Sequence, residues 1–301
     1  MMFTTPSVLL FPGQGTEAVG MSSGWEAQPA WVTTLAAAEA HTGYPLRRLM
    51  TEGPIEALRF QRHAPCAVLA HSVGLYRSWR IAGLPVPRAA TGHSMGFYSA
   101  LVAAGVVPLE AALDLLDTVE GLSEAAFAGR AMGMAFVIGV PELELRQALL
   151  AQPALALSNR NGQAQFTVSG PVEALEVLVA ALQPSAFKVG LLPVRHPLHG
   201  PHMAALLPAL ARRMAGVTPS APAFPLLSHF DGRLLTTGEE AWDDGLASIA
   251  LPVDWLAVVA RLGALASPLA ECGHGSQLAG LTRWADRALR VESLQRLPPQ
   301  A

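Results

Sequence analysis

The pentapeptide Gly92-His93-Ser94-Met95-Gly96 constrains the fold of this chain more than any other feature. It follows an apolar stretch, residues 84–90, and precedes a run of small and apolar residues, 99–107, that is typical of a helix. Gly-x-Ser-x-Gly between a strand and a helix is the nucleophile-elbow pattern, in which a sharp turn lifts the serine hydroxyl out of the sheet edge. The flanking glycines have no side chain to collide where strand and helix pack closely. The pattern predicts an α/β fold with Ser94 as a nucleophile; the alternative is a solvated serine in a glycine-rich turn.

The composition narrows the classes of protein and partner. The chain has 301 residues, of which 51% are hydrophobic and 14% charged, with a net charge of -3. The slightly acidic balance and the lack of a Lys/Arg-rich run argue against nucleic acid as a partner. No apolar run reaches membrane-spanning length, so we expect no membrane partner.

Two features concern the compartment. Cys66 and Cys272 lie far apart without metal-ligand spacing, as is typical of buried thiols in a reducing compartment. The N-terminal residues have neither a basic region nor a small-residue cleavage site. Both features favour a cytoplasmic protein.

The pattern of the chain changes at residues 129–133. The order that follows is strand, helix, strand, strand, helix, strand, with the segments 134–138, 141–151, 155–160, 165–169, 171–182 and 186–194. We place the hairpin turn between the middle strands at Asn161-Gly162, a strong turn dipeptide. This order is that of a ferredoxin-like unit. It predicts a ferredoxin-like small domain at 130–197, inserted into a catalytic domain formed by 1–129 plus 198–301.

Three histidines cluster where the chain returns from this insert, at His196, His199 and His202. A serine nucleophile needs a base within hydrogen-bond reach, and the edge of a cleft is a sensible place for one. Zinc is the alternative use of such a cluster. No carboxylate or cysteine lies nearby in the sequence to complete a tetrahedral site, so we expect no metal.

A second turn, Pro12-Gly13-Gln14-Gly15, follows the apolar residues 8–11, which predict a buried strand. Two glycines let the backbone approach a ligand closely and offer N–H groups to it. A plain tight turn explains the same residues equally well.

Taken together and in order, these motifs resemble those of the malonyl-CoA:acyl carrier protein transacylase family, which includes the acyltransferase domains of fatty acid and polyketide synthases. The residues that carry the resemblance are Phe11-Pro12-Gly13-Gln14-Gly15, Gly92-His93-Ser94-Met95-Gly96, Asn159-x-Asn161, His199-x-x-x-Met203, Pro252-Val253-x-Trp255 and Glu271-x-Gly273-x-Gly275. The resemblance covers nearly the whole chain. It implies an α/β-hydrolase-like core with a ferredoxin-like small domain.

The resemblance also implies roles. Ser94 attacks a thioester, and His199 is its general base and then the general acid. The backbone N–H groups of Gln14 and Met95 form the oxyanion hole, and the backbone carbonyl of Ser248 orients the histidine. The implied partners are an acyl-CoA and an acyl carrier protein, with coenzyme A as part of the substrate and no other cofactor, and we expect a monomer.

The departures from the family pattern concern the acyl group. Malonyl-specific members carry an arginine that pairs with the free carboxylate, and here Glu120 or Val119 stands in its place. A glutamate there would repel malonate, although Arg130 or Arg195 could supply a cation from another direction. The residues expected to line the acyl pocket are Glu120, Phe97, His196, Leu198 and Asn161.

The sequence therefore predicts an acyltransferase that moves an acyl group, malonyl by family default, from coenzyme A to an acyl carrier protein through an acyl-serine intermediate. The alternative keeps the same machinery and changes the acyl group. It is an acyltransferase, or a hydrolase of acyl carrier protein thioesters, acting on uncharged acyl groups.

Overall fold

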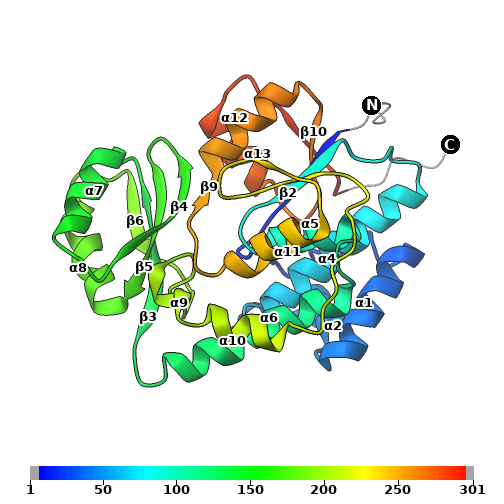
Figure 1. Cartoon of the computed structure of the whole chain (residues 1–301), viewed down its shortest axis with the longest axis horizontal. Helices are drawn as coiled ribbons and strands as arrows, with labels where there is room; N and C mark the ends of the chain where they lie inside the picture. Colours follow the sequence, from blue (N-terminus) through cyan, green and yellow to red (C-terminus); the bar gives the residue numbers. More distant parts are fainter. Residues whose placement is uncertain (1–6, 296–301) are drawn as a thin grey trace.

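The computed structural model describes residues 7–295, which form a mixed α/β fold with two β-sheets in two lobes (Figure 1). The larger sheet has six strands in the order β11-β10-β1-β2-β7-β8. All neighbours in it are parallel except β7 and β8. Its strands are β1 (Val8–Phe11), β2 (Ala89–Gly92), β7 (Leu226–Leu227), β8 (Leu234–Leu235), β10 (Leu269–Glu271) and β11 (Val291–Ser293).

Helices cover both faces of this sheet. The central strand β1 is apolar at every position, so both of its faces must be shielded from water. In β1, Leu9 and Phe11 face a core shared with α1 and α4, whereas Val8 and Leu10 face a core shared with α12 and α13. All four side chains are fully buried, so the two-residue period of the strand divides them between two cores. The helices of this lobe are α1 (Pro29–Thr42), α2 (Leu46–Glu52), α3 (Ile55–Leu58), α4 (His63–Ile81), α5 (Gly96–Ala103), α6 (Leu109–Ala126), α9 (Pro201–Ala204), α10 (Leu207–Arg213), α11 (Gly238–Ala247), α12 (Trp255–Leu265) and α13 (Gln277–Ala285).

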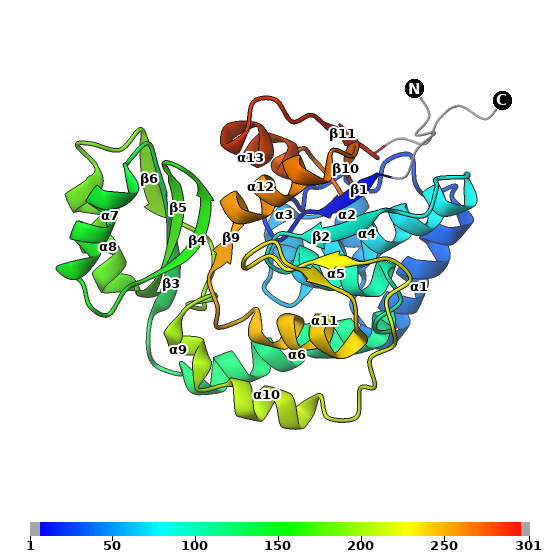
Figure 2. The same cartoon turned by 45° about the horizontal axis from the view of Figure 1, so that its top comes forward.

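The smaller sheet has five strands in the order β6-β3-β5-β4-β9. The first four, with the two helices of this lobe, have the order and antiparallel pairing of a ferredoxin-like unit. Figure 2 shows this lobe standing beside the larger one. Its elements are β3 (Met132–Ile138), α7 (Glu142–Leu150), β4 (Ala156–Gly162), β5 (Gln165–Pro171), α8 (Val172–Leu182) and β6 (Lys188–Leu191).

The fifth strand, β9 (Val253–Asp254), comes from the chain beyond the predicted insert and pairs in parallel with β4. The Arg160 guanidinium lies 3.2 Å from the Asp254 carboxylate across this junction. We propose that the small domain spans 130–197 and the catalytic domain 1–129 plus 198–301, with β9 as a strand that the catalytic domain adds to the small sheet.

Two local expectations differ from the structure. The strand expected in the apolar stretch 84–90 begins at Ala89, because Pro85 and Pro87 have no N–H to donate to a ladder. The hairpin turn lies at residues 163–164, and Asn161 and Gly162 belong to β4. The pairing of β4 with β5 skips Asn161, which leaves its side chain free for another contact.

A buried carboxylate ties β10 to α13. Glu271 is 1% exposed, and its two carboxylate oxygens accept hydrogen bonds from the backbone N–H groups of Leu278 (3.0 Å) and Ala279 (2.9 Å). Replacing Glu271 with alanine is expected to lower the free energy of unfolding by about 1–3 kcal/mol, because the buried N–H of Leu278 and the half-buried N–H of Ala279 would lose their acceptor. Chemical denaturation measures the change.

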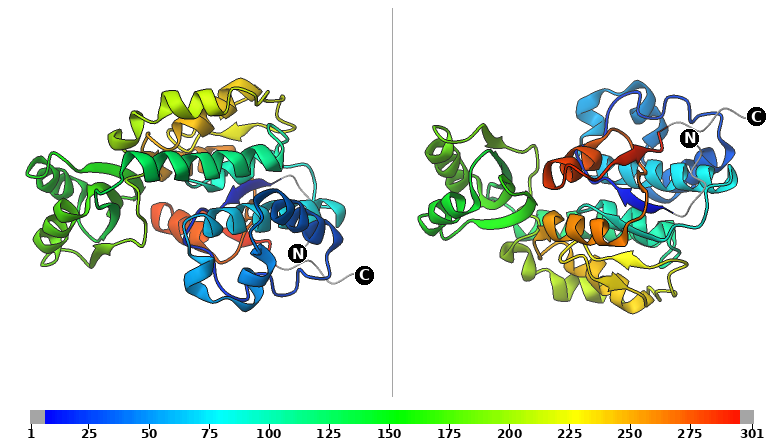
Figure 3. Two further views of the ribbon diagram at one scale, coloured as in Figure 1. Left: turned by 90° about the horizontal axis from the view of Figure 1, so that it is seen from below. Right: turned by 90° about the horizontal axis from the view of Figure 1, so that it is seen from above.

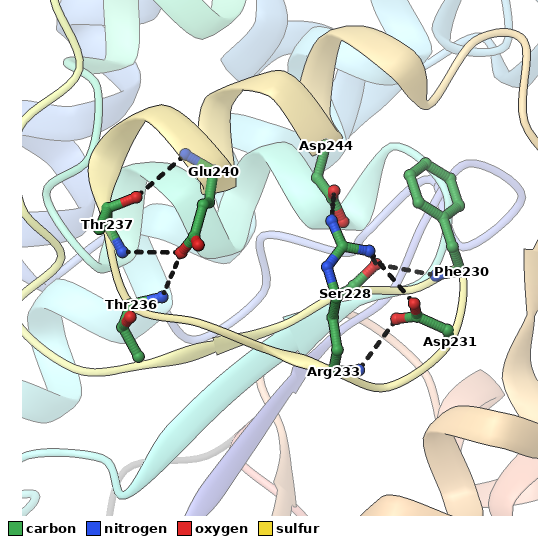
Figure 4. Close-up of polar contacts among 8 residues, drawn as sticks. All are labelled: Ser228, Phe230, Asp231, Arg233, Thr236, Thr237, Glu240 and Asp244. Atoms are coloured by element: carbon green, nitrogen blue, oxygen red, sulfur yellow. Dashed lines mark hydrogen bonds and ion pairs between the residues drawn. The ribbon is translucent and has the colours of Figure 1, made fainter.

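Glu240 is the matched control for that prediction. Its carboxylate accepts hydrogen bonds from the backbone N–H groups of Thr236 and Thr237 at the start of α11 (Figure 4). The Glu240 side chain is exposed, so water can replace it, and Glu240→Ala should cost less stability than Glu271→Ala. Equal losses in the two variants would contradict the role given to Glu271.

Candidate active site

Ser94 lies on the sharp turn between the end of β2 and the start of α5, as the pentapeptide predicts. Its φ angle is 54°, in the left-handed region that few non-glycine residues adopt. Among the described residues, the other non-glycine residues with positive φ are His199, at 58°, and Ala266, at 47°. Strained backbone of this kind clusters at functional sites, and here it occurs at both members of one side-chain pair.

The elbow depends on glycine at Gly96, the first residue of α5. A Cβ atom there would lie 2.1 Å from the carbonyl oxygen of Phe11, at the end of β1. Replacing Gly96 with alanine is expected to lower the free energy of unfolding by about 3 kcal/mol, because backbone atoms must move apart. In α13, a Cβ on Gly280 would meet nothing within 4 Å, so Gly280→Ala should raise stability by about 0.5–1 kcal/mol. Denaturation curves of the two variants measure both changes, and a loss below about 1 kcal/mol for Gly96→Ala would show that the elbow tolerates a side chain.

The Ser94 hydroxyl and the His199 imidazole form a hydrogen bond of 2.6 Å between Oγ and Nε2. The other ring nitrogen, Nδ1, lies 2.6 Å from the backbone carbonyl oxygen of Ser248. A carbonyl only accepts, so Nδ1 carries the proton and donates it to Ser248. Nε2 is then the unprotonated nitrogen and accepts from the serine hydroxyl, which is the arrangement of a general base.

Burial holds this imidazole neutral. His199 is 4% exposed, and desolvation, with the nearby His93 adding to it, lowers the pKa of His199 to about 4. Hydrogen bonds to backbone carbonyls act in the opposite direction and are the weaker influence. The base is therefore in its active form at neutral pH.

The pH dependence of serine acylation follows from this lowered pKa. The rate should stay level from about pH 8 to about pH 5 and fall tenfold per pH unit below a midpoint of about 4, where the imidazole takes up a proton. Single-turnover acylation across this range, with folding checked by circular dichroism, measures it. A midpoint near the ordinary histidine value of about 6.5 would contradict the buried, neutral base.

Two backbone N–H groups flank the serine. Gln14, in the turn after β1, and Met95, at the start of α5, both line the cavity that Ser94 enters. Neither N–H donates to any group in residues 7–295. Unpaired donors of this kind beside a nucleophile can stabilise the oxyanion of a tetrahedral intermediate.

The carbonyl that orients His199 belongs to the C-cap of α11, and this helix is anchored along its length (Figure 4). Arg233, after β7, forms an ion pair with Asp244, whose side chain is buried. The Tyr98 hydroxyl on α5 donates to the backbone carbonyl of Gly245 at 3.2 Å. These contacts fix the end of α11 against the elbow helix and with it the position of the Ser248 carbonyl.

The three clustered histidines separate in the structure. His199 pairs with Ser94, His196 approaches Glu120, and the ring Nε2 of His202 lies 2.8 Å from the carbonyl of Ala154. In the part of the chain that the structure describes, no three His, Cys, Asp or Glu side chains are grouped to hold a metal ion. No helix among residues 7–295 has the length and apolar character to cross a membrane.

A small cavity of about 60 Å³ opens beside Ser94. Of the side chains expected to form the acyl pocket, Glu120, His196 and Leu198 line it. Phe97 is fully buried and packs against the His229 ring, with ring centroids 4.8 Å apart. The Asn161 side-chain oxygen lies 2.7 Å from Nε2 of His93 instead of in the lining.

Comparison with known proteins identifies the family. Residues 8–240 match the family described as acyl transferase domain. The chain belongs to this family. It is an acyltransferase with the mixed α/β fold expected from the sequence.

Relatives of the acyl transferase domain family match over nearly the full chain. The malonyl CoA-acyl carrier protein transacylase of Escherichia coli K12 is 33% identical over 285 residues, which are 93% of this chain and 92% of that protein. The acyl-carrier-protein S-malonyltransferase of Burkholderia pseudomallei superposes with a TM-score of 0.90 at 28% identity, covering 97% of each chain. A malonyl-transacylase in complex with its type II PKS acyl carrier protein gives a TM-score of 0.91 at 29% identity, also over 97% of each chain.

The elements that the sequence did not predict are α11 and the short strands β8, β9, β10 and β11. A signal for α11 was present, because Thr237 and Glu240 have the spacing of a capping box, and the structure forms that box. The short strands carry few residues with a clear alternation and depend on their neighbours in the sheet.

Proposed function

We propose that this chain transfers an acyl group from a coenzyme A thioester to the phosphopantetheine thiol of an acyl carrier protein, through an acyl ester on Ser94. The observation that carries the proposal is the 2.6 Å contact of Ser94 Oγ with His199 Nε2, with the opposite ring nitrogen bound to a carbonyl. The relatives are named as enzymes that transfer malonyl from coenzyme A to acyl carrier protein, which supports the donor and the acceptor proposed for this chain.

In the first half of the reaction, Ser94 Oγ attacks the thioester carbonyl carbon while its proton passes to Nε2 of His199. The carbonyl oxygen becomes an oxyanion between the N–H groups of Gln14 and Met95. Collapse of this intermediate breaks the C–S bond, and the coenzyme A thiolate takes the proton from His199.

The second half repeats these steps with a different thiol. The phosphopantetheine thiol gives its proton to His199 and attacks the acyl ester, and Ser94 leaves with that proton. One imidazole therefore acts as base and as acid in each half. The lowered pKa of His199 suits the base role, and the Ser248 carbonyl stabilises the imidazolium that forms briefly.

A second candidate keeps this machinery and changes the acyl group, and the observation that favours it is Glu120 in the cavity lining. The candidates to pair with a malonyl carboxylate were Arg130 and Arg195. Both are exposed and lie outside the cavity lining. An acyl group without a free carboxylate meets no like charge in such a cavity.

Steady-state kinetics with holo-acyl carrier protein test the proposed reaction. Malonyl-CoA, acetyl-CoA and a longer acyl-CoA serve as donors in parallel, and acyl-carrier protein is measured by mass. Parallel lines in double-reciprocal plots, the pattern of a ping-pong mechanism, are expected with at least one donor. Intersecting lines with every donor would contradict an acyl-enzyme, and acyl release to water without carrier protein would favour hydrolysis.

We propose the cytoplasm as the compartment, in keeping with two buried, free cysteines, Cys66 and Cys272. The monomeric state stays a prediction.

A further inference from the structure

The acyl cavity contains a carboxylate at a position where the helix pattern calls for an apolar residue. Leu113, Leu116 and Glu120 follow one another at spacings of three and four residues on α6, so they share one face of that helix. Leu113 is buried and Leu116 is half-buried against the main core, yet Glu120 is only 9% exposed on the same stripe. In Figure 3, α6 runs from the large lobe toward the small one, which brings its C-terminal half to the junction of the lobes.

The partner of this carboxylate comes from the other side of the cavity. His196, on the return from the small lobe, is 6% exposed, and its Nε2 lies 3.0 Å from Oε1 of Glu120. The two groups are at ion-pair distance but out of hydrogen-bond alignment, and neither ring nitrogen of His196 has a hydrogen-bond partner among the described residues. Oε2 of Glu120 accepts no hydrogen bond from residues 7–295. Neither oxygen of Glu120 is fully enclosed, so this unused acceptor is open to a donor that enters the cavity.

The remaining lining supplies no cation. The other residues around the cavity are polar, apolar or aromatic, among them Gln14, Tyr98 and Leu116. No lysine or arginine is among the described residues of the lining. A second carboxylate entering this space would meet Glu120 with little water to screen the repulsion.

We propose that Glu120 and His196 select the acyl group, and that the group transferred carries a hydrogen-bond donor, an ammonium or a hydroxyl, at its far end in place of a carboxylate. This inference rests on the proposed function, because the selection occurs at the cavity beside Ser94. The free Oε2 of Glu120 accepts from the donor, and His196 holds the carboxylate in place from the opposite side. Either donor would form a charge-assisted hydrogen bond with the carboxylate, and an ammonium also carries the opposite charge, so it is the better fit of the two.

Four coenzyme A thioesters of nearly equal size separate the possibilities. They are β-alanyl-CoA with an ammonium, 3-hydroxypropionyl-CoA with a hydroxyl, butyryl-CoA with a methyl and malonyl-CoA with a carboxylate at the same distance from the thioester. The rate of acyl-enzyme formation is measured for each by intact-protein mass. We expect β-alanyl-CoA to react about tenfold faster than butyryl-CoA and about a hundredfold faster than malonyl-CoA, with 3-hydroxypropionyl-CoA between the first two.

Glu120→Gln tests the assigned residue with almost no change in shape. The preference for β-alanyl-CoA over malonyl-CoA should fall below about tenfold, because the amide has no charge and can itself donate to a carboxylate. Glu124→Gln is the matched control. This change removes a carboxylate from the same helix, where Glu124 pairs with Arg62 outside the cavity. The Glu124→Gln variant should react with the four thioesters in the same order of rates as the wild type.

The outcomes separate the inference from the reaction. A wild-type enzyme that reacts with malonyl-CoA or butyryl-CoA as fast as with both donor-bearing thioesters would overturn the inference and leave the acyl-enzyme mechanism standing. If folded Glu120→Gln reacted with the four thioesters at the same relative rates as the wild type, the role of Glu120 would be overturned. No adduct from any of the four thioesters would overturn the proposed function, and the inference with it.

Discussion

Replacing Ser94 with alanine is expected to lower the rate of acyl transfer to the carrier protein by about 10⁴- to 10⁶-fold, the size of effect seen when a Ser–His site loses one of its two members. The reason is that every step of the proposed reaction passes through a bond to Ser94 Oγ. The His199 imidazole and the N–H groups of Gln14 and Met95 would remain, but they would have no nucleophile to activate. The rate of acyl-carrier protein formation under saturating acyl-CoA measures the loss.

Ser99 provides the control on the same helix. Its side chain is fully buried on α5, and its hydroxyl has no hydrogen-bond partner among the described residues. Ser99→Ala removes a hydroxyl of the same kind and should leave the transfer rate within about threefold of the wild type, because nothing in the reaction uses it. Comparable rates in the Ser94 and Ser99 variants would mean that the acyl group never resides on Ser94.

Replacing His199 with alanine is expected to cause a loss of similar size, about 10⁴- to 10⁶-fold, because the serine hydroxyl would keep its proton at neutral pH. The double variant Ser94→Ala with His199→Ala should be little slower than either single variant, since the two residues act as one unit. Single-turnover acylation with the preferred thioester measures the His199 effect directly.

His202 is the corresponding control. It lies three residues further along the chain, and its ring contacts the carbonyl of Ala154 and does not line the cavity. His202→Ala should acylate Ser94 at close to the wild-type rate. A loss below about tenfold for His199→Ala would instead reduce that residue to a structural role and leave the base unassigned.

The sequence was sufficient to predict the elements with strong local signals. The elbow depends on residues within one pentapeptide, and the structure forms it there, with Ser94 in the strained turn. The order of strands and helices in 130–197 follows from alternation and turn residues, and four of the strands pair in the ferredoxin-like order. Both features arise from contacts between residues that are close in the sequence, or from a residue pattern that repeats along a helix or strand.

The rest depends on contacts that no local pattern encodes. The strand β9 adds two residues to a sheet formed almost wholly by another segment, and its pairing is set by the packing of the lobes. The approach of Glu120 to His196 joins residues far apart in the chain. The sequence placed both in the acyl pocket through a resemblance, but their pairing is visible only in three dimensions.

The role of Ser248 shows the same limit. Its backbone carbonyl is the functional group, so its side chain gives no signal in the sequence. The position of that carbonyl depends on how α11 ends, and α11 is held by Arg233 and Tyr98 from other elements. Backbone groups of this kind are found from the fold and not from residue types.

The most direct test of an acyl-serine mechanism is the intact mass of the protein after brief exposure to acyl-CoA, followed by addition of holo-acyl carrier protein. We expect one acyl group per chain, located on Ser94 by peptide mapping, that disappears as acyl-carrier protein forms at the same rate. Full transfer with no covalent adduct on Ser94 at any time, or an adduct that persists while transfer proceeds, would contradict this mechanism.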